Sequence, residues 1–349
     1  MTPEPDPPSI PAARLPTRLR AKDLAGFAVG LVLFALVLRW LAPDWAELRA
    51  AARFDWRWAL FGLLGTTLAS FTTAARWRLL AEAMGGTKLP FVTYFHALVM
   101  TRVLGQFLPT MAVDLVGRGM ALRSAGSKRG LGHAATQVVL ERMFDAVLPV
   151  VVLAWALSVR ADLLPAEVPL AASLAGFAGV FMLVAIPLLR PSVGVALRVY
   201  LWLKLRLPGA RRKAVEAEAE AELAETPAVD AKLATQVAAL SLARYATVVI
   251  QFWGIAGAIG LSISWSDMTA AASVAQLAGL LSLTPGGLGI LEAGWAGALG
   301  WIGLGSAAIG LWVLGQRLGI LGFFGLLTAL SYPLAAQHKR ARETAEASA

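Results

Sequence analysis

Long stretches without charge are the feature that most limits how this chain can fold. A helix needs roughly 20 apolar residues to cross a bilayer core about 30 Å thick. With 58% hydrophobic and 15% charged residues, a soluble protein of 349 residues would have too little polar surface. We therefore predict an all-α polytopic membrane protein with about six full spans. The predicted spans are residues 24–41, 58–77, 133–159, 168–189, 233–261 and 306–332.

Two further apolar regions, residues 91–123 and 269–302, are each interrupted near the middle. The first break lies in GQFLPTMAVD and the second in LTPGGLGILE. Lipid cannot satisfy the backbone groups that a break frees, so such a break must be buried in protein or line a wet cavity. We predict two broken re-entrant helical hairpins, with two fully spanning hairpins as the alternative. The residues expected at the breaks are Gly105, Pro109, Pro285, Gly286, Gly287 and Gly289.

The formal net charge of +9 is explained by membrane topology. Basic residues precede the first span, which places the N-terminus in the cytoplasm by the positive-inside rule, and six spans return the C-terminus to the same side. The hairpins then enter from opposite sides and their breaks meet near the midplane, as in an inverted repeat. Topology alone supports that symmetry, because the two halves share no obvious identity. We expect a multi-pass protein of the bacterial cytoplasmic (inner) membrane that does not bind nucleic acid.

The expected organisation has a polar tail at each end of one membrane domain. Residues 1–22 are rich in proline and predict a disordered cytoplasmic tail rather than a cleaved signal. Residues 23–335 form the transmembrane domain, and residues 336–349 a cytoplasmic tail. Within the domain, residues 190–232 predict a cytoplasmic connection with an amphipathic part and then an acidic helix in AVEAEAEAELAE.

Nine ionisable residues fall inside the predicted spans or hairpins. A charge at the bilayer centre costs about 3 kcal/mol, so these side chains should face the bundle interior and be paired. An excess of arginine there suits an anionic ligand such as a phospholipid phosphate, and the nine residues are our candidates for contact with a lipid head group. They are Arg102, Asp114, Arg118, Glu141, Arg142, Asp145, Arg244, Glu292 and Arg317.

Two local patterns among these residues allow more than one interpretation. On a helix, Glu141 and Asp145 share a face, and Arg142 can reach Asp145 at a spacing of three. They form either an ion-pair network that holds helices together or a group that positions an arginine or contacts a cationic head group. Glu292 begins a half-helix, where it either caps free amides or pairs with an arginine such as Arg317.

The sequence lacks the residue patterns of the common catalytic and cofactor sites. It contains no cysteine, and His96, His133 and His338 are scattered without metal-ligand spacing. GGLG is not a nucleotide motif, because no strand precedes it and no GK[ST] follows. We expect no catalytic residue, no metal, no cofactor and no enzymatic activity.

In combination and order, several motifs resemble the lysylphosphatidylglycerol synthase transmembrane-region family of flippase-like proteins, over nearly all of residues 24–332. Val113 precedes Asp114, where the family pattern has glycine. The motifs are RWRLL (76–80), GQFLPTMAVDLVGRGMAL (105–122), VVLERMFD (138–145) and LTPGGLGILEAG (283–294), together with Arg317.

This resemblance implies a role in moving lipids across the bilayer. Bifunctional relatives also carry a cytoplasmic aminoacyltransferase domain, which we do not expect here. The expected function is translocation of a phospholipid, an aminoacyl-phospholipid or a related lipid, with membrane lipids as partners. The alternative is an accessory subunit in a lipid-glycan or hopanoid pathway, with a lipid-modifying enzyme as partner.

Overall fold

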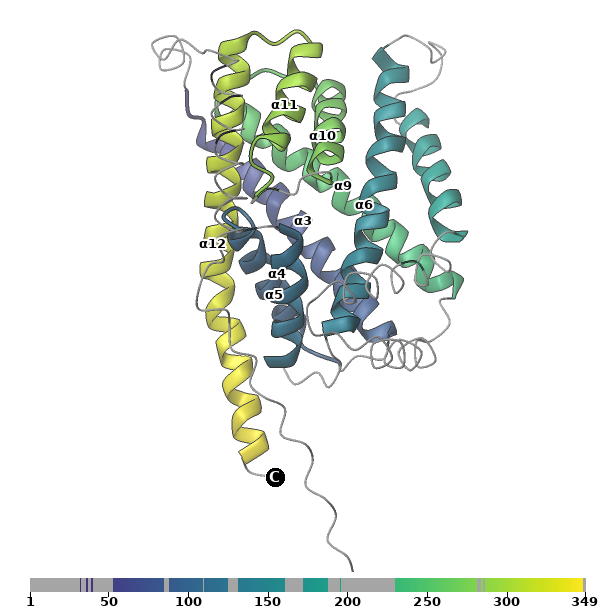
Figure 1. Cartoon of the computed structure of the whole chain (residues 1–349), viewed down its shortest axis with the longest axis vertical. Coiled ribbons are helices and arrows are strands. Elements are labelled where there is room, and N and C mark those ends of the chain that lie inside the picture. Colours follow the sequence, from purple (N-terminus) through teal and green to yellow (C-terminus); the bar gives the residue numbers. More distant parts are fainter. Residues whose placement is uncertain are drawn as a thin grey trace, which may run out of the picture.

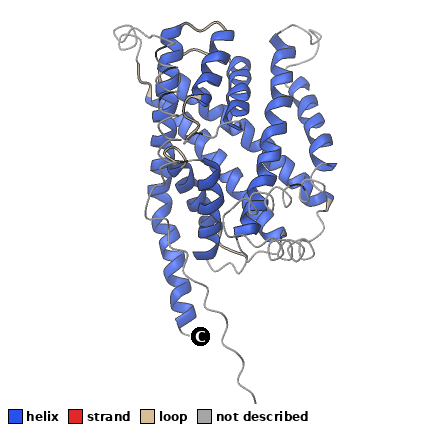
Figure 2. Ribbon diagram, in the orientation of Figure 1, coloured by secondary structure: helices blue, strands red, loops and turns tan. Residues whose placement is uncertain are grey.

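The computed structural model describes residues 53–84, 88–108, 110–124, 131–160, 172–187, 230–280, 284 and 286–347, with isolated positions at 32, 36, 39 and 195. Within these ranges the chain forms helices and turns and no strands (Figure 2), so the predicted all-α class is confirmed. The helices are α3 (Trp56–Ala83), α4 (Phe91–Leu104), α5 (Thr110–Ser124), α6 (Leu131–Arg160), α9 (Ala231–Ala258), α10 (Trp265–Leu280), α11 (Ile290–Trp301) and α12 (Ser306–Ala347).

Four segments are long and apolar enough to cross a membrane. They are Trp56–Ala83, Gln137–Val159, Ala231–Ala258 and Ser306–His338, and they confirm the predicted spans 58–77, 133–159, 233–261 and 306–332. The predicted span 168–189 contains the shorter apolar helix Ala172–Pro187. The predicted span 24–41 falls almost wholly outside the described residues, as do the tail 1–22 and nearly all of the connection 190–232.

Helix α12 is longer than the predicted span that it contains. It passes through Pro333 and continues to Ala347, into the segment predicted as a polar tail. The residues after Pro333 are mainly alanine and charged residues with high helix propensity, which allows the helix to continue beyond the apolar stretch.

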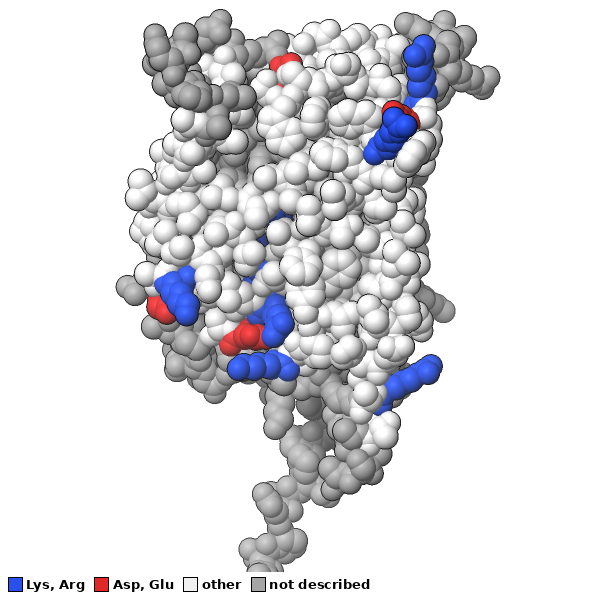
Figure 3. All heavy atoms as spheres, turned by 180° about the vertical axis from the view of Figure 1, so that it is seen from behind, with Lys and Arg blue, Asp and Glu red and all other residues white. Residues whose placement is uncertain are grey.

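The surface has the pattern expected of a bundle surrounded by lipid. Figure 3 shows charged side chains mainly near the two ends of one face, with a broad band of uncharged residues between them. Large apolar side chains such as Leu60, Leu64 and Phe71 of α3 are exposed rather than buried. In water such a surface would be unfavourable, whereas in a bilayer it contacts lipid chains.

The two interrupted regions form two pairs of short helices. Helices α4 and α5 lie in the lower half of the bundle in Figure 1, α10 and α11 lie in the upper half, and α12 runs along both pairs. Helices of 12 to 16 residues are about 18–24 Å long, which is less than the thickness of a bilayer core. Helix α4 ends at Leu104, and glycines with positive φ precede α11, so both interruptions lie in the regions that the sequence predicts. Pro109, residues 281–283 and Pro285 lie outside the described residues.

Helices α3 and α9 pack closely against each other and cross the bundle obliquely (Figure 1). A Cβ atom on Gly254 would lie 2.3 Å from the backbone nitrogen of Gly62, and one on Gly65 would lie 2.5 Å from that of Gln251. Small residues at such contacts let two membrane helices approach closely. The close approach brings residues of α9 beside the end of α3 that carries Arg76.

Candidate functional site

Two groups of polar side chains occupy the interior of the bundle. The first, here called the arginine cluster, draws on α3, α4, α5, α6 and α9. The second, here called the hairpin clasp, lies where the turns of the two hairpins meet. The arginine cluster consists of Arg76, Arg102, Asp114, Arg118, Glu141, Arg142, Asp145 and Arg244, and the hairpin clasp consists of Gln106, Gly286, Gly289, Glu292 and Arg317.

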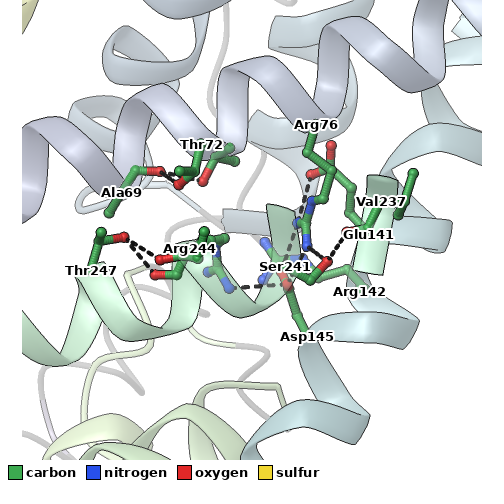
Figure 4. Close-up of polar contacts among 12 residues, drawn as sticks. Ala69, Thr72, Arg76, Glu141, Arg142, Asp145, Val237, Ser241, Arg244 and Thr247 are labelled. Atoms are coloured by element: carbon green, nitrogen blue, oxygen red, sulfur yellow. Dashed lines mark hydrogen bonds and ion pairs between the residues drawn. The ribbon is translucent and has the colours of Figure 1, made fainter. Parts of the chain in front are cut away.

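Arg76 of α3 is the centre of the arginine cluster and is 0% exposed. Its Nη1 atom donates to Asp145 Oδ1 at 2.9 Å and to Ser241 Oγ at 2.9 Å. Its Nη2 atom lies 3.3 Å from Glu141 Oε2. In Figure 4 the Arg76 side chain points from α3 towards Glu141 and Asp145 on α6 and Ser241 on α9. One guanidinium therefore holds three helices together.

Arg118 of α5 completes the buried part of the cluster. Its Nη1 atom donates to Glu141 Oε2 at 2.8 Å, and its guanidinium lies 4.9 Å from the centroid of the Trp77 ring. Trp77 in turn donates from Nε1 to Gln137 Oε1 at 2.9 Å. Stacking on an aromatic ring favours arginine where the surroundings are desolvated.

The other three arginines of the cluster are partly exposed, whereas Asp114, which two of them contact, is buried. Arg142 donates from Nη2 to Asp114 Oδ2 at 2.6 Å, and Arg102 lies 3.7 Å from the same oxygen. Arg244 donates from Nη1 to Asp145 Oδ1 at 3.0 Å. Helical spacing would also allow Arg142 to reach Asp145, but the structure directs its hydrogen bond to α5. The approach of α5 to α6 decides that choice, because it brings Asp114 within reach.

Each carboxylate of the arginine cluster contacts two arginines. Glu141 contacts Arg76 and Arg118, Asp145 contacts Arg76 and Arg244, and Asp114 contacts Arg102 and Arg142. Among the described residues, five guanidinium groups thus face three carboxylates. Uncompensated positive charge is costly in a desolvated interior, so the cluster favours the approach of an anionic group.

The hairpin clasp contains the remaining two site candidates, Glu292 and Arg317. Glu292 is 0% exposed, accepts a hydrogen bond from Gly289 N through Oε2 at 2.6 Å, and accepts another from Arg317 Nε through Oε1 at 2.6 Å. Both roles considered for Glu292, as a cap and as an ion-pair partner, are thus present together. The Glu292 carboxylate therefore provides a negative group at the N-terminal end of α11.

Arg317 also links the two breaks to each other. Its Nη1 atom donates to Gln106 Oε1 in the first break at 3.0 Å and to the carbonyl oxygen of Gly286 in the second at 2.7 Å. The backbone nitrogen of Gly286 donates to Leu108 O at 3.3 Å. The two turns therefore touch. A Cβ atom on Gly286 would lie 2.5 Å from the carbonyl oxygen of Gln106, and its φ of +61° also favours glycine.

The other candidate residues at the breaks have simpler positions. Gly287 and Gly289 both have positive φ, 71° and 84°, in the turn before α11. Gly105 follows α4 in a right-handed helical conformation and caps its end. Positive φ angles at Gly286, Gly287 and Gly289 thus shape the second break. The first break does not require a positive φ at Gly105.

Several polar residues of the site were not among the candidates chosen from the sequence. Arg76 lies at the end of a predicted span, where an arginine is usually solvated, and its position gives no sign of full burial. Gln106 and Ser241 are uncharged, so a search for buried charge passes over them. The RWRLL motif that contains Arg76 is the one signal that could have found it.

A hollow of about 690 Å³ opens at the end of the bundle where α3 begins and α9 ends. It lies at the opposite end of α3 from Arg76. Basic and aromatic side chains such as Arg53, Arg57, Trp58 and Trp253 line it, together with Asp55. The arginine cluster thus lies in the half of the bundle that contains Arg76, and the hairpin clasp lies between the two hairpins. The hollow lies at the end of the bundle where α3 begins.

Fold and site together define a polytopic all-α membrane protein with charged groups enclosed among its helices. The profile of the lysylphosphatidylglycerol synthase TM region matches residues 25–328 of this chain, and the chain belongs to that family. Membership places it among membrane proteins of lipid metabolism or transport. No curated protein and no solved structure matches the chain.

Proposed function

We propose that this protein moves a phosphate-bearing lipid across the bacterial cytoplasmic membrane without changing it chemically. The observation that carries the proposal is the arginine cluster, where five guanidinium groups face three carboxylates among the described residues. A lipid phosphate supplies the negative charge that the cluster lacks, and the surrounding helices shield the head group from hydrocarbon.

The proposal includes an orientation. Arg78, Lys88 and Arg340 lie at the end of the bundle to which Arg76 is nearer, and an excess of basic residues marks the cytoplasmic side. The arginine cluster then faces the cytoplasmic leaflet, and the hollow near Arg57 faces the outer leaflet. A head group would pass from one to the other only if the hairpin clasp opens, so under this proposal the contacts of the clasp belong to a closed state.

A vesicle assay tests the function directly. The full chain is reconstituted into phosphatidylcholine vesicles with traces of fluorescent phosphatidylglycerol or aminoacyl-phosphatidylglycerol, and dithionite then quenches the outer leaflet. We expect quenching to proceed beyond the outer-leaflet fraction in vesicles with protein and to stop there in empty vesicles. Mass spectrometry of the recovered lipid should show it unchanged.

Either of two results would overturn the proposal. Quenching equal to that of empty vesicles for both lipids would contradict translocation, and co-purification of a lipid-modifying enzyme would then favour the accessory role. A chemically altered lipid would contradict transport without catalysis.

A further inference from the structure

The five arginines of the cluster fall into two groups by exposure. The side chains of Arg76 and Arg118 are 0% and 2% exposed. Those of Arg102, Arg142 and Arg244 are 21%, 29% and 14% exposed. The first group is enclosed by protein and holds helices together. The side chains of the second group keep some surface that no described residue covers.

The partly exposed arginines also have hydrogen-bonding capacity to spare. Among the described residues, each is paired with a single carboxylate, Arg102 and Arg142 with Asp114 and Arg244 with Asp145. A guanidinium has five N–H donors, so most of these donors are free for another acceptor.

The same three arginines come from three helices and contact two carboxylates, Asp114 and Asp145. Arg102 of α4 and Arg142 of α6 approach one oxygen of Asp114. Arg244 of α9 contacts Asp145 Oδ1 at 3.0 Å, and Asp145 lies one helical turn after Arg142 on α6. Like charges at neighbouring positions repel one another, and an anion between them would convert that repulsion into attraction.

Asp114 provides an independent sign of a missing ligand. Its side chain is 1% exposed, and both arginine contacts fall on Oδ2. Its other oxygen, Oδ1, is buried and has no hydrogen-bond partner among the described residues. A buried carboxylate oxygen without a donor is unfavourable, so this position calls for a hydroxyl or ammonium group from outside the protein.

We propose that Arg102, Arg142 and Arg244 bind the phosphodiester of a lipid head group, and that Asp114 Oδ1 accepts a hydrogen bond from a hydroxyl or ammonium group beyond that phosphate. Arginine forks match the paired oxygens of a phosphodiester. The ligand class is therefore a phospholipid whose head group carries a hydrogen-bond donor. The inference rests on the proposed function, because it names the head-group site of that same lipid.

Two lipids of equal charge can distinguish binding of the phosphodiester by the arginines from hydrogen bonding to Asp114 Oδ1. Phosphatidylglycerol and phosphatidylmethanol both carry one phosphodiester, but only the first has hydroxyl donors. We expect the purified full chain to bind short-chain phosphatidylglycerol about tenfold more tightly than short-chain phosphatidylmethanol, measured by native mass spectrometry. Asp114→Ala should reduce this preference to less than about twofold, because alanine can neither accept a hydrogen bond from the hydroxyl group nor donate one to it.

Arginine variants test the phosphate part. Arg102→Gln, Arg142→Gln and Arg244→Gln should each weaken phosphatidylglycerol binding about tenfold or more. Arg78→Gln is the matched control, because Arg78 is exposed and pairs with Glu82 within α3. If Arg244→Gln fails to fold, Arg102→Gln decides, because its 3.7 Å contact contributes least to the fold. Unchanged binding in a folded Arg102→Gln protein would overturn the inference.

Competition with inorganic phosphate tests whether the site binds a lipid or free phosphate. We expect millimolar phosphate to leave bound phosphatidylglycerol in place, and displacement at that concentration would overturn the lipid assignment. The proposed function can fail separately. If the protein transfers lipid between leaflets but all three arginine variants bind phosphatidylglycerol normally, only the binding site is contradicted. If binding follows these expectations but no lipid is transferred, only the proposed function is contradicted.

Discussion

Arg317, which is partly exposed, and Glu292, which is buried, form an ion pair that also joins the turns of the two hairpins. The pair connects α12 to α11, and the Arg317 guanidinium reaches Gln106 in the opposite hairpin as well. These contacts stabilise the centre of the bundle, and under the proposed function they also block the path of a head group. A lipid translocator must break them in each cycle, whereas a static membrane protein has no reason to.

Arg317→Gln should destabilise the protein strongly. It leaves the Glu292 carboxylate buried without its positive partner, which costs about 3–5 kcal/mol in comparable buried pairs. The melting temperature in detergent, followed by tryptophan fluorescence, measures the effect. The double variant Glu292→Gln with Arg317→Gln should lose less stability than the two single changes added together, because no charge is then left unpaired. Additive losses would contradict the ion pair.

Gly286→Ala should weaken the contact between the hairpins. A Cβ atom there would lie 2.5 Å from the carbonyl oxygen of Gln106, and the positive φ adds a cost of about 1–2 kcal/mol for alanine. The matched control is Gly297→Ala in α11, where an added Cβ meets no atom within 4 Å and helix propensity should improve. Equal melting temperatures for the two variants would show that the turns do not touch as described.

Arg76→Gln should be more damaging than any other single arginine change in the arginine cluster. Glu141 would keep only Arg118 and Asp145 only Arg244, and the contact to Ser241 on α9 would be lost. We expect a loss of about 3–5 kcal/mol. Arg78→Gln, two residues later on the exposed side of α3, should change the melting temperature little. A similar stability for both variants would mean that Arg76 is solvated in the membrane.

Gly65→Ala should separate α3 from α9. The new Cβ would lie 2.5 Å from the backbone of Gln251, and such overpacking costs about 1–3 kcal/mol. Gly176→Ala, in the helix Ala172–Pro187, meets no atom within 4 Å and serves as the control. Both variants are compared by melting temperature, and a stable Gly65→Ala protein would contradict the close helix crossing.

The proposed topology can be tested with single cysteines, because the natural sequence contains none. Trp56 and His338 are both exposed; Trp56 begins α3 and His338 lies in the last part of α12, and Figure 1 places these two helix ends at opposite ends of the bundle. In intact cells, an impermeant maleimide should label Trp56→Cys and should label His338→Cys only after the membrane is opened. The reverse pattern would place the arginine cluster on the outer side.

Much of the fold could be predicted from the sequence. Four of the six expected spans and both interrupted regions appear where the sequence places them, because length, hydropathy, proline and glycine act locally along the chain. The span 24–41 is not among the described residues. The burial of Glu292 also follows from the sequence, because a carboxylate within an apolar segment must turn inwards.

The partners of the buried charges were decided only by the tertiary structure. Arg76 and Ser241 are 165 residues apart in sequence, and Arg317 and Gln106 are 211 apart. Arg142 pairs with Asp114 on another helix rather than with Asp145 one turn away on its own. An apolar pattern determines that a helix crosses the membrane, but it is nearly uniform around these helices and does not specify which faces meet. Close contacts such as that of Gly65 with Gln251 fix those faces, and they thereby determine which arginines are enclosed and which stay partly exposed.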